Sequence, residues 1–239
     1  MSKSKEGILS DLLKGIGPDK LCDKMYLTGF LGIEGEDYAK DRELMVIGRA
    51  VNGWTEYGWL PKDSAAKAEE IVNQIIKESP ILWTKLCHNG YMKKAPFWSV
   101  IKKITEELKI SDDENNCPSK LFWSNLYKIS PYCGGNPDDS LIKLQAESCK
   151  KLLEAEILEA KPQKILMLTG LDYWAQPFLD GLQISEHLQK GDEKYVERKG
   201  CWNNCKVVVA KHPQGKVQQE YVKEVVAAFE KLNCSESHK

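Results

Sequence analysis

The sequence contains no apolar run that approaches the roughly 20 residues needed to span a bilayer, and its N-terminal segment lacks the apolar centre of a secretion signal. An excess of either charge is also absent, because 34 basic and 35 acidic residues leave a formal net charge of −1 over 239 residues. No broad positive field therefore surrounds the chain. These absences predict a cytoplasmic protein without membrane contacts, and they exclude nucleic-acid binding that relies on overall charge.

A Cys-x-x-Cys pair is likewise absent, although the sequence has eight cysteines. In a cytoplasmic protein these cysteines do not predict a disulfide framework, and we interpret most of them as small buried residues. Cys201, Cys205 and His212 have the side chains of a zinc site, but their spacing matches no standard site and a fourth ligand is not evident. We therefore expect neither a metal ion nor another cofactor.

What the sequence does contain is an alternation of helical and strand patterns. Helical periodicity predicts helices over Gly7–Ile16, Asp63–Glu78, Phe97–Ile110, Asp138–Pro162 and Val217–Leu232. Asp63 or Ser64 is expected to cap the second helix, which should end before Pro80. Short apolar runs predict strands over Glu43–Gly48, Leu121–Ser130, Lys164–Gly170 and Cys205–Pro213. Apolar strands separated by helices are typical of a buried parallel sheet. We therefore expect an α/β protein, a three-layer α/β/α sandwich with a central four-stranded, mostly parallel sheet.

This architecture predicts where a ligand would bind. In open parallel sheets, ligands bind outside the carboxyl ends of the strands. Asn52, Asn125, Gly170 and His212 each lie at or just after one of the four predicted strand ends. We expect them to converge on one cleft, with Pro213 stiffening the turn that carries His212.

The motifs at these strand ends, taken in order, resemble the uracil-DNA glycosylase superfamily. "VIGRAVNGW" resembles its first motif, a glycine-rich loop that positions the attacking water, and "KHPQG" resembles its second, usually His-Pro-Ser. Between them, Ser124–Gly170 resembles the iron–sulfur bacterial and archaeal branch of the superfamily. The resemblance covers about 43–232, and it implies a single domain of this fold over 1–239.

The sequence departs from the pattern of that branch at several positions. Arg49 stands where the branch has a carboxylate, and a guanidinium cannot act as a general base because it stays protonated. Gln214 replaces the serine of the second motif, and Ile129 replaces a cluster cysteine. Cys149 alone cannot hold a cluster that needs four thiolates. We therefore expect no iron–sulfur cluster.

The resemblance implies roles for individual residues. Asn52 would hold the attacking water, His212 would stabilise negative charge on the departing base, and Asn125 would hydrogen-bond the edge of the base. The other residues expected to bind substrate are Gly48, Arg49, Gly53, Trp54, Lys211 and Gln214. The stacking face would come from Trp54, Tyr57 or Trp123.

Each of these residues also has an ordinary structural explanation. Asn52 and Gly53 together are typical of a plain turn, and Asn125 can instead bond a neighbouring backbone. His212 can satisfy a carbonyl, and Arg49 can pair with a phosphate or with an acidic residue such as Glu56. The structural and functional explanations both stay open at this point.

The function implied by the resemblance is that of a DNA glycosylase that removes uracil or another deaminated base. Its partner would be DNA, single- or double-stranded, bound weakly because the net charge is near zero. Two alternatives stay open: a catalytically inactive nucleic-acid-binding member of the same fold, and an enzyme that acts on a free nucleoside. The preferred base, the strand preference and the oligomeric state are not indicated.

Overall fold

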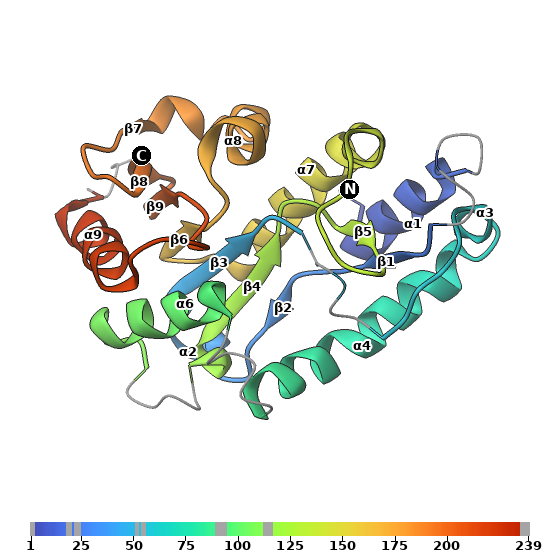
Figure 1. Ribbon diagram of the computed structural model, residues 1–239, viewed down its shortest axis with the longest axis horizontal. Helices are drawn as coiled ribbons and strands as arrows, with labels where there is room; N and C mark the ends of the chain where they lie inside the picture. The colour runs from blue at the N-terminus through green and yellow to red at the C-terminus, as the bar shows by residue number, and fades with distance from the viewer. Residues whose placement is uncertain are drawn as a thin grey trace. The chain divides into compact units, whose positions relative to one another are not determined.

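The computed structural model describes residues 3–17, 21, 25–50, 53, 56–88, 95–111 and 117–234, with the backbone only over 81–88. These residues form a mixed α/β structure of helices and two sheets (Figure 1). The chain divides into two compact units: unit 1 comprises Met1–Ile33, Arg49–Thr84 and Ser124–Glu159, and unit 2 comprises Glu34–Gly48, Lys85–Trp123 and Ala160–Lys239. That the whole chain is one domain stays a prediction.

The larger sheet has seven strands in the order β2-β4-β3-β6-β9-β8-β7, not the four expected. The bounds of these strands are β2 (Ile33–Glu34), β3 (Leu44–Gly48), β4 (Leu121–Asn125), β6 (Lys164–Met167), β7 (Leu188–Lys190), β8 (Val196–Trp202) and β9 (Cys205–Ala210). β3 pairs parallel with β6, and β6 pairs parallel with β9. β8 runs antiparallel to both β9 and β7, so the sheet is mixed.

The expected strands were found where the sequence is continuously apolar. Every residue of β3 is buried, and so are Val207, Val208 and Val209 in β9. β8 was missed because its sequence, "VERKGCW", has no continuous apolar run and carries three charged residues, and four of its seven positions are only half-buried. Its place near the end of the sheet order explains this composition, because strands near a sheet edge are covered less completely.

Helix α9 (Gln218–Lys231) of unit 2 covers strands β8 and β9 of the larger sheet. It also packs against α6 (Pro96–Glu107), as Figure 1 shows. The buried side of α9 includes residues four apart, Tyr221, Val225 and Phe229, which lie on one face of a helix. The remaining elements of unit 2 are α2 (Tyr38–Asp41), η1 (Pro118–Lys120), η2 (Leu171–Ala175), α8 (Gln176–Gly181) and η3 (Ser185–His187).

Unit 1 contains the small antiparallel sheet of β1 (Leu27–Gly29) and β5 (Ile129–Pro131). The single strand expected over Leu121–Ser130 is therefore wrong, because the chain leaves the large sheet at Asn125 and pairs with β1 from Ile129. The helices of unit 1 are α1 (Lys5–Gly15), α3 (Pro61–Ser64), most of α4 (Ala68–His88) and most of α7 (Asp139–Ala160).

The expected ends of the second helix are also wrong. Asp63 and Ser64 belong to the short helix α3, and α4 continues past Pro80 to His88. The Ser64 hydroxyl instead accepts a hydrogen bond from the Trp59 indole nitrogen at 2.9 Å. Among the helices formed by the described residues, none is long and apolar enough to cross a membrane.

Candidate functional site

The parallel strands of unit 2 bring several loop segments to one edge of the sheet. Met167 of β6 lies opposite Val209 of β9, so both strands end at the same level. Just beyond, the backbone N–H of Gly170 donates to the carbonyl of Ala210 at 2.9 Å. Gly170 and the turn that carries His212 therefore lie at the carboxyl ends of neighbouring strands, where ligands bind in open parallel sheets.

His212 is held in one orientation by its neighbours. The backbone N–H of Gln214 donates to its Nδ1 at 3.3 Å, so the neutral imidazole carries its hydrogen on Nε2. The ring stacks on Phe97 with centroids 6.3 Å apart and 23° between the planes. A fixed, half-buried imidazole with its N–H on Nε2 is a preorganised hydrogen-bond donor.

The turn that carries His212 is fixed by hydrogen bonds to both backbone polar groups of Lys211. The N–H of Lys211 donates to the carbonyl of Tyr195 at 2.9 Å, and the hydroxyl of the buried Tyr221 donates to the carbonyl of Lys211 at 2.5 Å. Burial raises the pKa of Tyr221 far above its ordinary value, so its hydroxyl remains a donor. Gly215 has a φ of 72°, a conformation that favours glycine. Lys211 is half-buried and Gln214 is exposed.

Trp123 is a core residue and not the stacking face we expected. Its side chain is completely buried, and its indole meets that of Trp98 edge-to-face at 4.9 Å and 77°. Trp98 in turn meets Phe97 edge-to-face at 5.2 Å. These rings form a chain of aromatic contacts that leads from Trp123 through Trp98 and Phe97 to the imidazole of His212.

Asn125 has the feature in unit 1 that most needs an explanation. It is the last residue of β4 and is 2% exposed. Its side-chain nitrogen Nδ2 is buried and has no hydrogen-bond partner among the described residues. An unpaired buried donor costs about 1–3 kcal/mol, so each one needs an explanation, and a bound ligand is one of those explanations. The ordinary explanation, that this amide nitrogen bonds a neighbouring backbone carbonyl, is not what the structure describes.

The first-motif loop lies against the connection that follows Asn125. The carbonyl of Arg49 accepts the backbone N–H of Tyr127 at 2.9 Å. Gly53 has a φ of 70°, and a Cβ atom there would lie 2.7 Å from the backbone nitrogen of Gly134. Only glycine fits this contact, so the two segments touch backbone to backbone. Asn52 and Trp54 lie outside the described residues, Tyr57 is half-buried and Gly48 is buried.

A buried ion pair that sequence reasoning missed stabilises the same connection. Lys128 Nζ lies 2.6 Å from Glu156 Oε2, and both side chains are completely buried. The hydroxyl of Ser124 bonds both groups, at 2.8 Å to Lys128 Nζ and 2.5 Å to Glu156 Oε2. Glu156 Oε1 accepts the N–H of Gly32 at 2.7 Å. The available signal was a lysine within an apolar segment, "LFWSNLYKIS", which requires a buried partner.

Gln145 on α7 holds the next part of the connection. Its Oε1 accepts the backbone N–H groups of Lys128 and Ile129 at 3.1 and 2.9 Å, and its Nε2 donates to the carbonyl of Ile129 at 2.8 Å. Ile129 stands at the expected cluster-cysteine position and is fully buried as an apolar residue of β5. The segment from Ser124 to Ile129 is therefore fixed to α7 by side-chain hydrogen bonds.

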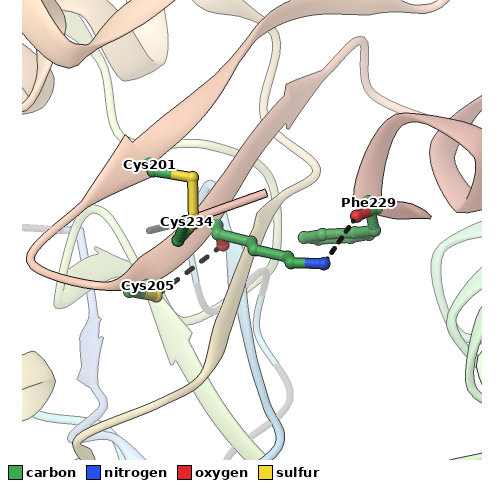
Figure 2. Close-up of a disulfide and its surroundings, with 5 residues drawn as sticks. Cys201, Cys205, Phe229 and Cys234 are labelled. Carbon is green, nitrogen blue, oxygen red and sulfur yellow. Dashed lines mark hydrogen bonds between the residues drawn. A yellow bond between two sulfur atoms is a disulfide. The ribbon is translucent and has the colours of Figure 1, made fainter. Parts of the chain in front are cut away.

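Cys201 and Cys205, which have the side chains of a zinc site, differ in their bonding: Cys205 is a free, buried thiol, whereas Cys201 is oxidised. Cys201 of β8 forms a disulfide with Cys234, a residue that follows α9 (Figure 2). A second contact joins β9 to α9, because Lys206 Nζ donates to the carbonyl of Phe229, near the end of α9, at 3.0 Å. The disulfide also corrects the interpretation of Cys201 as a plain buried residue. The partner is 33 residues away, and no local pattern indicated it.

Among the described residues, no group of three or more His, Cys, Asp or Glu is placed to hold a metal ion.

Removal of this disulfide should destabilise the protein. The crosslink closes a loop of 33 residues, and loops of this size are typically worth about 2–4 kcal/mol. We expect the double variant Cys201→Ser/Cys234→Ser to lose that much free energy of unfolding in urea titrations. Dithiothreitol should destabilise the wild type by a similar amount and leave the double variant unchanged. A variant as stable as the wild type would show that the crosslink contributes nothing.

The free thiols should differ sharply in reactivity. Burial raises the pKa of both Cys149 and Cys205 to about 12, so neither forms a thiolate at pH 8. Cys133 is exposed. Iodoacetamide at pH 8 should label Cys133 in the native protein and reach Cys149 and Cys205 only after unfolding, as mapped by peptide mass spectrometry. Equal labelling of the three would contradict the burial described.

The same two thiols give the stability of the protein a pH dependence. Their folded pKa values lie above the ordinary value, so the unfolded chain loses these protons first as the pH rises. Their contribution is complete below about pH 9 and declines as the pH rises toward about 12.

The sequence was compared with family models and with curated proteins, and neither comparison returned a match.

Proposed function

We propose that this chain is a uracil-DNA glycosylase-like protein that binds a flipped, deaminated base and hydrolyses its bond to the sugar. The observation that supports this proposal most strongly is the buried, unpaired Nδ2 of Asn125 at the end of β4. A base edge presents carbonyl oxygens and ring N–H groups, and an amide side chain donates to the first and accepts from the second. A bound base would therefore satisfy Asn125.

His212 would assist the departure of the base. In the reaction the bond between the sugar carbon C1′ and the base nitrogen breaks, and the base leaves with the electron pair. A water oxygen then bonds to C1′, and one water proton finally returns to the base. The Nε2–H of His212 would donate to the base oxygen on which negative charge develops.

The proposed site lacks a residue that could activate the attacking water. Asn52, the residue expected to hold it, can orient a water but cannot take its proton, and Arg49 cannot do so either. We therefore expect slow turnover. The same residues favour the second candidate, a protein of the same class that binds the base without cleaving it.

Asn125→Leu separates binding from folding. Leucine has the same number of side-chain heavy atoms as asparagine and the same branching at Cγ, and it removes the unpaired donor, so the free energy of unfolding should be unchanged or higher. Affinity for an oligonucleotide that contains uracil should fall about 10- to 100-fold, as expected for the loss of a hydrogen bond to a buried amide. Binding by fluorescence anisotropy and unfolding in urea measure the two effects.

The matched control is Ser130→Ala, because Ser130 Oγ is also buried and unpaired but belongs to β5. This control should bind as the wild type does. Oligonucleotides that carry uracil, hypoxanthine or xanthine, each single- and double-stranded, would identify the base and the strand preference. Binding without base release selects the non-catalytic candidate. Equal affinity for uracil and thymine oligonucleotides, unchanged in Asn125→Leu, would overturn the proposal.

A further inference from the structure

The turn that follows β6 presents two aromatic side chains at the edge of the sheet. Tyr173 is 53% exposed, and Trp174 is half-buried. Their rings meet edge-to-face with centroids 5.2 Å apart and 82° between the planes. Large aromatic side chains are usually buried because they remove much apolar surface from water, so an exposed pair calls for an explanation.

The backbone holds this pair in place. Tyr173 and Trp174 lie in η2, a π-helical turn. Such turns are rare in proteins, and those that occur are often found at functional sites. At its start, Gly170 has a φ of 78° and is hydrogen-bonded to Ala210 of β9. The N–H of Leu171 donates to Glu197 Oε2 at 2.9 Å, and the N–H of Ala175 donates to the carbonyl of Gly170 at 3.2 Å. The aromatic pair is thus carried by a turn that is fixed at both ends.

The pair shares its sheet edge with His212. The backbone N–H of Gly170 donates to the carbonyl of Ala210, which precedes His212 by two residues. The strands that lead to Gly170 and to His212, β6 and β9, are a parallel pair. Lys211 adds a cationic side chain at this edge. An aromatic face, a fixed imidazole donor and a cation are the groups that bind a base, its edge and its phosphate.

We infer that Tyr173 and Trp174 stack an unpaired base of a DNA strand. The inference rests on the proposed function, which places nucleic acid at this edge. A stable protein partner would cover about 800 Å² on each side, far more than two rings offer. One base matches the size of the pair, and stacking on an aromatic ring accepts any base.

The test uses a fluorescein-labelled oligonucleotide of twelve thymidines, which contains no damaged base. Stacking contributes about 1–3 kcal/mol per base, so Tyr173→Ala should weaken binding about 5- to 150-fold. Tyr173→Phe keeps the ring and should bind nearly as well as the wild type. The matched control is Tyr26→Ala, because Tyr26 is also 53% exposed and lies in an aromatic pair, 6.5 Å from Tyr132, but belongs to unit 1. Tyr26→Ala should leave binding unchanged.

The outcomes distinguish this inference from the proposed function. Base release by the wild type together with unchanged affinity in Tyr173→Ala overturns the inference and leaves the function standing. Binding that depends on Tyr173, without release of any base, supports the inference and overturns the enzymatic proposal. Equal losses in Tyr173→Ala and Tyr26→Ala, or no binding by the wild type at millimolar protein, overturn the inference.

Discussion

His212→Ala is expected to lower the rate of base release by about 10²–10³, the usual effect of removing one preorganised donor to a developing anion. The Nε2–H that His212 offers would be lost, while affinity for an abasic product should change little because that product carries no base. His212→Gln keeps a neutral donor and should recover part of the rate. Single-turnover release from a uracil oligonucleotide measures these effects.

The control histidine is His187, which lies in η3 of the same unit with its side chain 48% exposed. His187→Ala should release base at the wild-type rate. The ordinary explanation of His212, that it only satisfies the loop, predicts a different result: a loss of about 1 kcal/mol of stability with full activity. A His212→Ala protein that melts early and retains its activity would disprove the assignment.

Breaking the buried ion pair should cause the largest loss of stability. Lys128→Met leaves Glu156 as an uncompensated buried carboxylate, and removal of one partner of such a pair costs about 3–5 kcal/mol. Replacing both, in Lys128→Met/Glu156→Leu, removes the stranded charge and should restore much of the loss. Urea unfolding measures both variants.

A second ion pair of α7, between Glu159 and Lys5 of α1, is less deeply buried and provides the comparison. Lys5 pairs with Glu159, whose side chain is 49% exposed, and Glu159→Ala should cost less than about 1 kcal/mol. Similar losses in Glu159→Ala and Lys128→Met would contradict a special role for the buried pair. Because Ser124 bonds both charges and precedes Asn125, Lys128→Met should also weaken base binding in whatever fraction stays folded.

The sequence predicted the parallel strands of the sheet well, because those strands are apolar without interruption. β3, β6 and β9 lie where the runs at Leu44, Ile165 and Val207 placed them. The antiparallel strands β7 and β8 were missed because their patterns are too polar to be read as buried. The break between Asn125 and Ile129 was missed because the segment stays apolar across it, and its one charged residue, Lys128, finds a buried partner on α7.

The candidate site was predictable to a similar degree. The positions of His212 and Gly170 after parallel strands are as expected, because strand ends can be located from the sequence. The stacking assignment of Trp123 is wrong, since a tryptophan within a strand cannot be told apart as core or surface by its type alone. The Cys201–Cys234 disulfide could not be foreseen, because it joins residues far apart in the chain.

The state of the Asn125 side-chain amide tests the central claim most directly. Its two proton resonances can be assigned in nitrogen-15 spectra by their loss in Asn125→Leu. We expect both to shift when a uracil oligonucleotide binds, and to stay in place with the same oligonucleotide carrying an abasic site. Resonances that do not move at saturation with uracil, or that move equally with the abasic strand, would contradict the account.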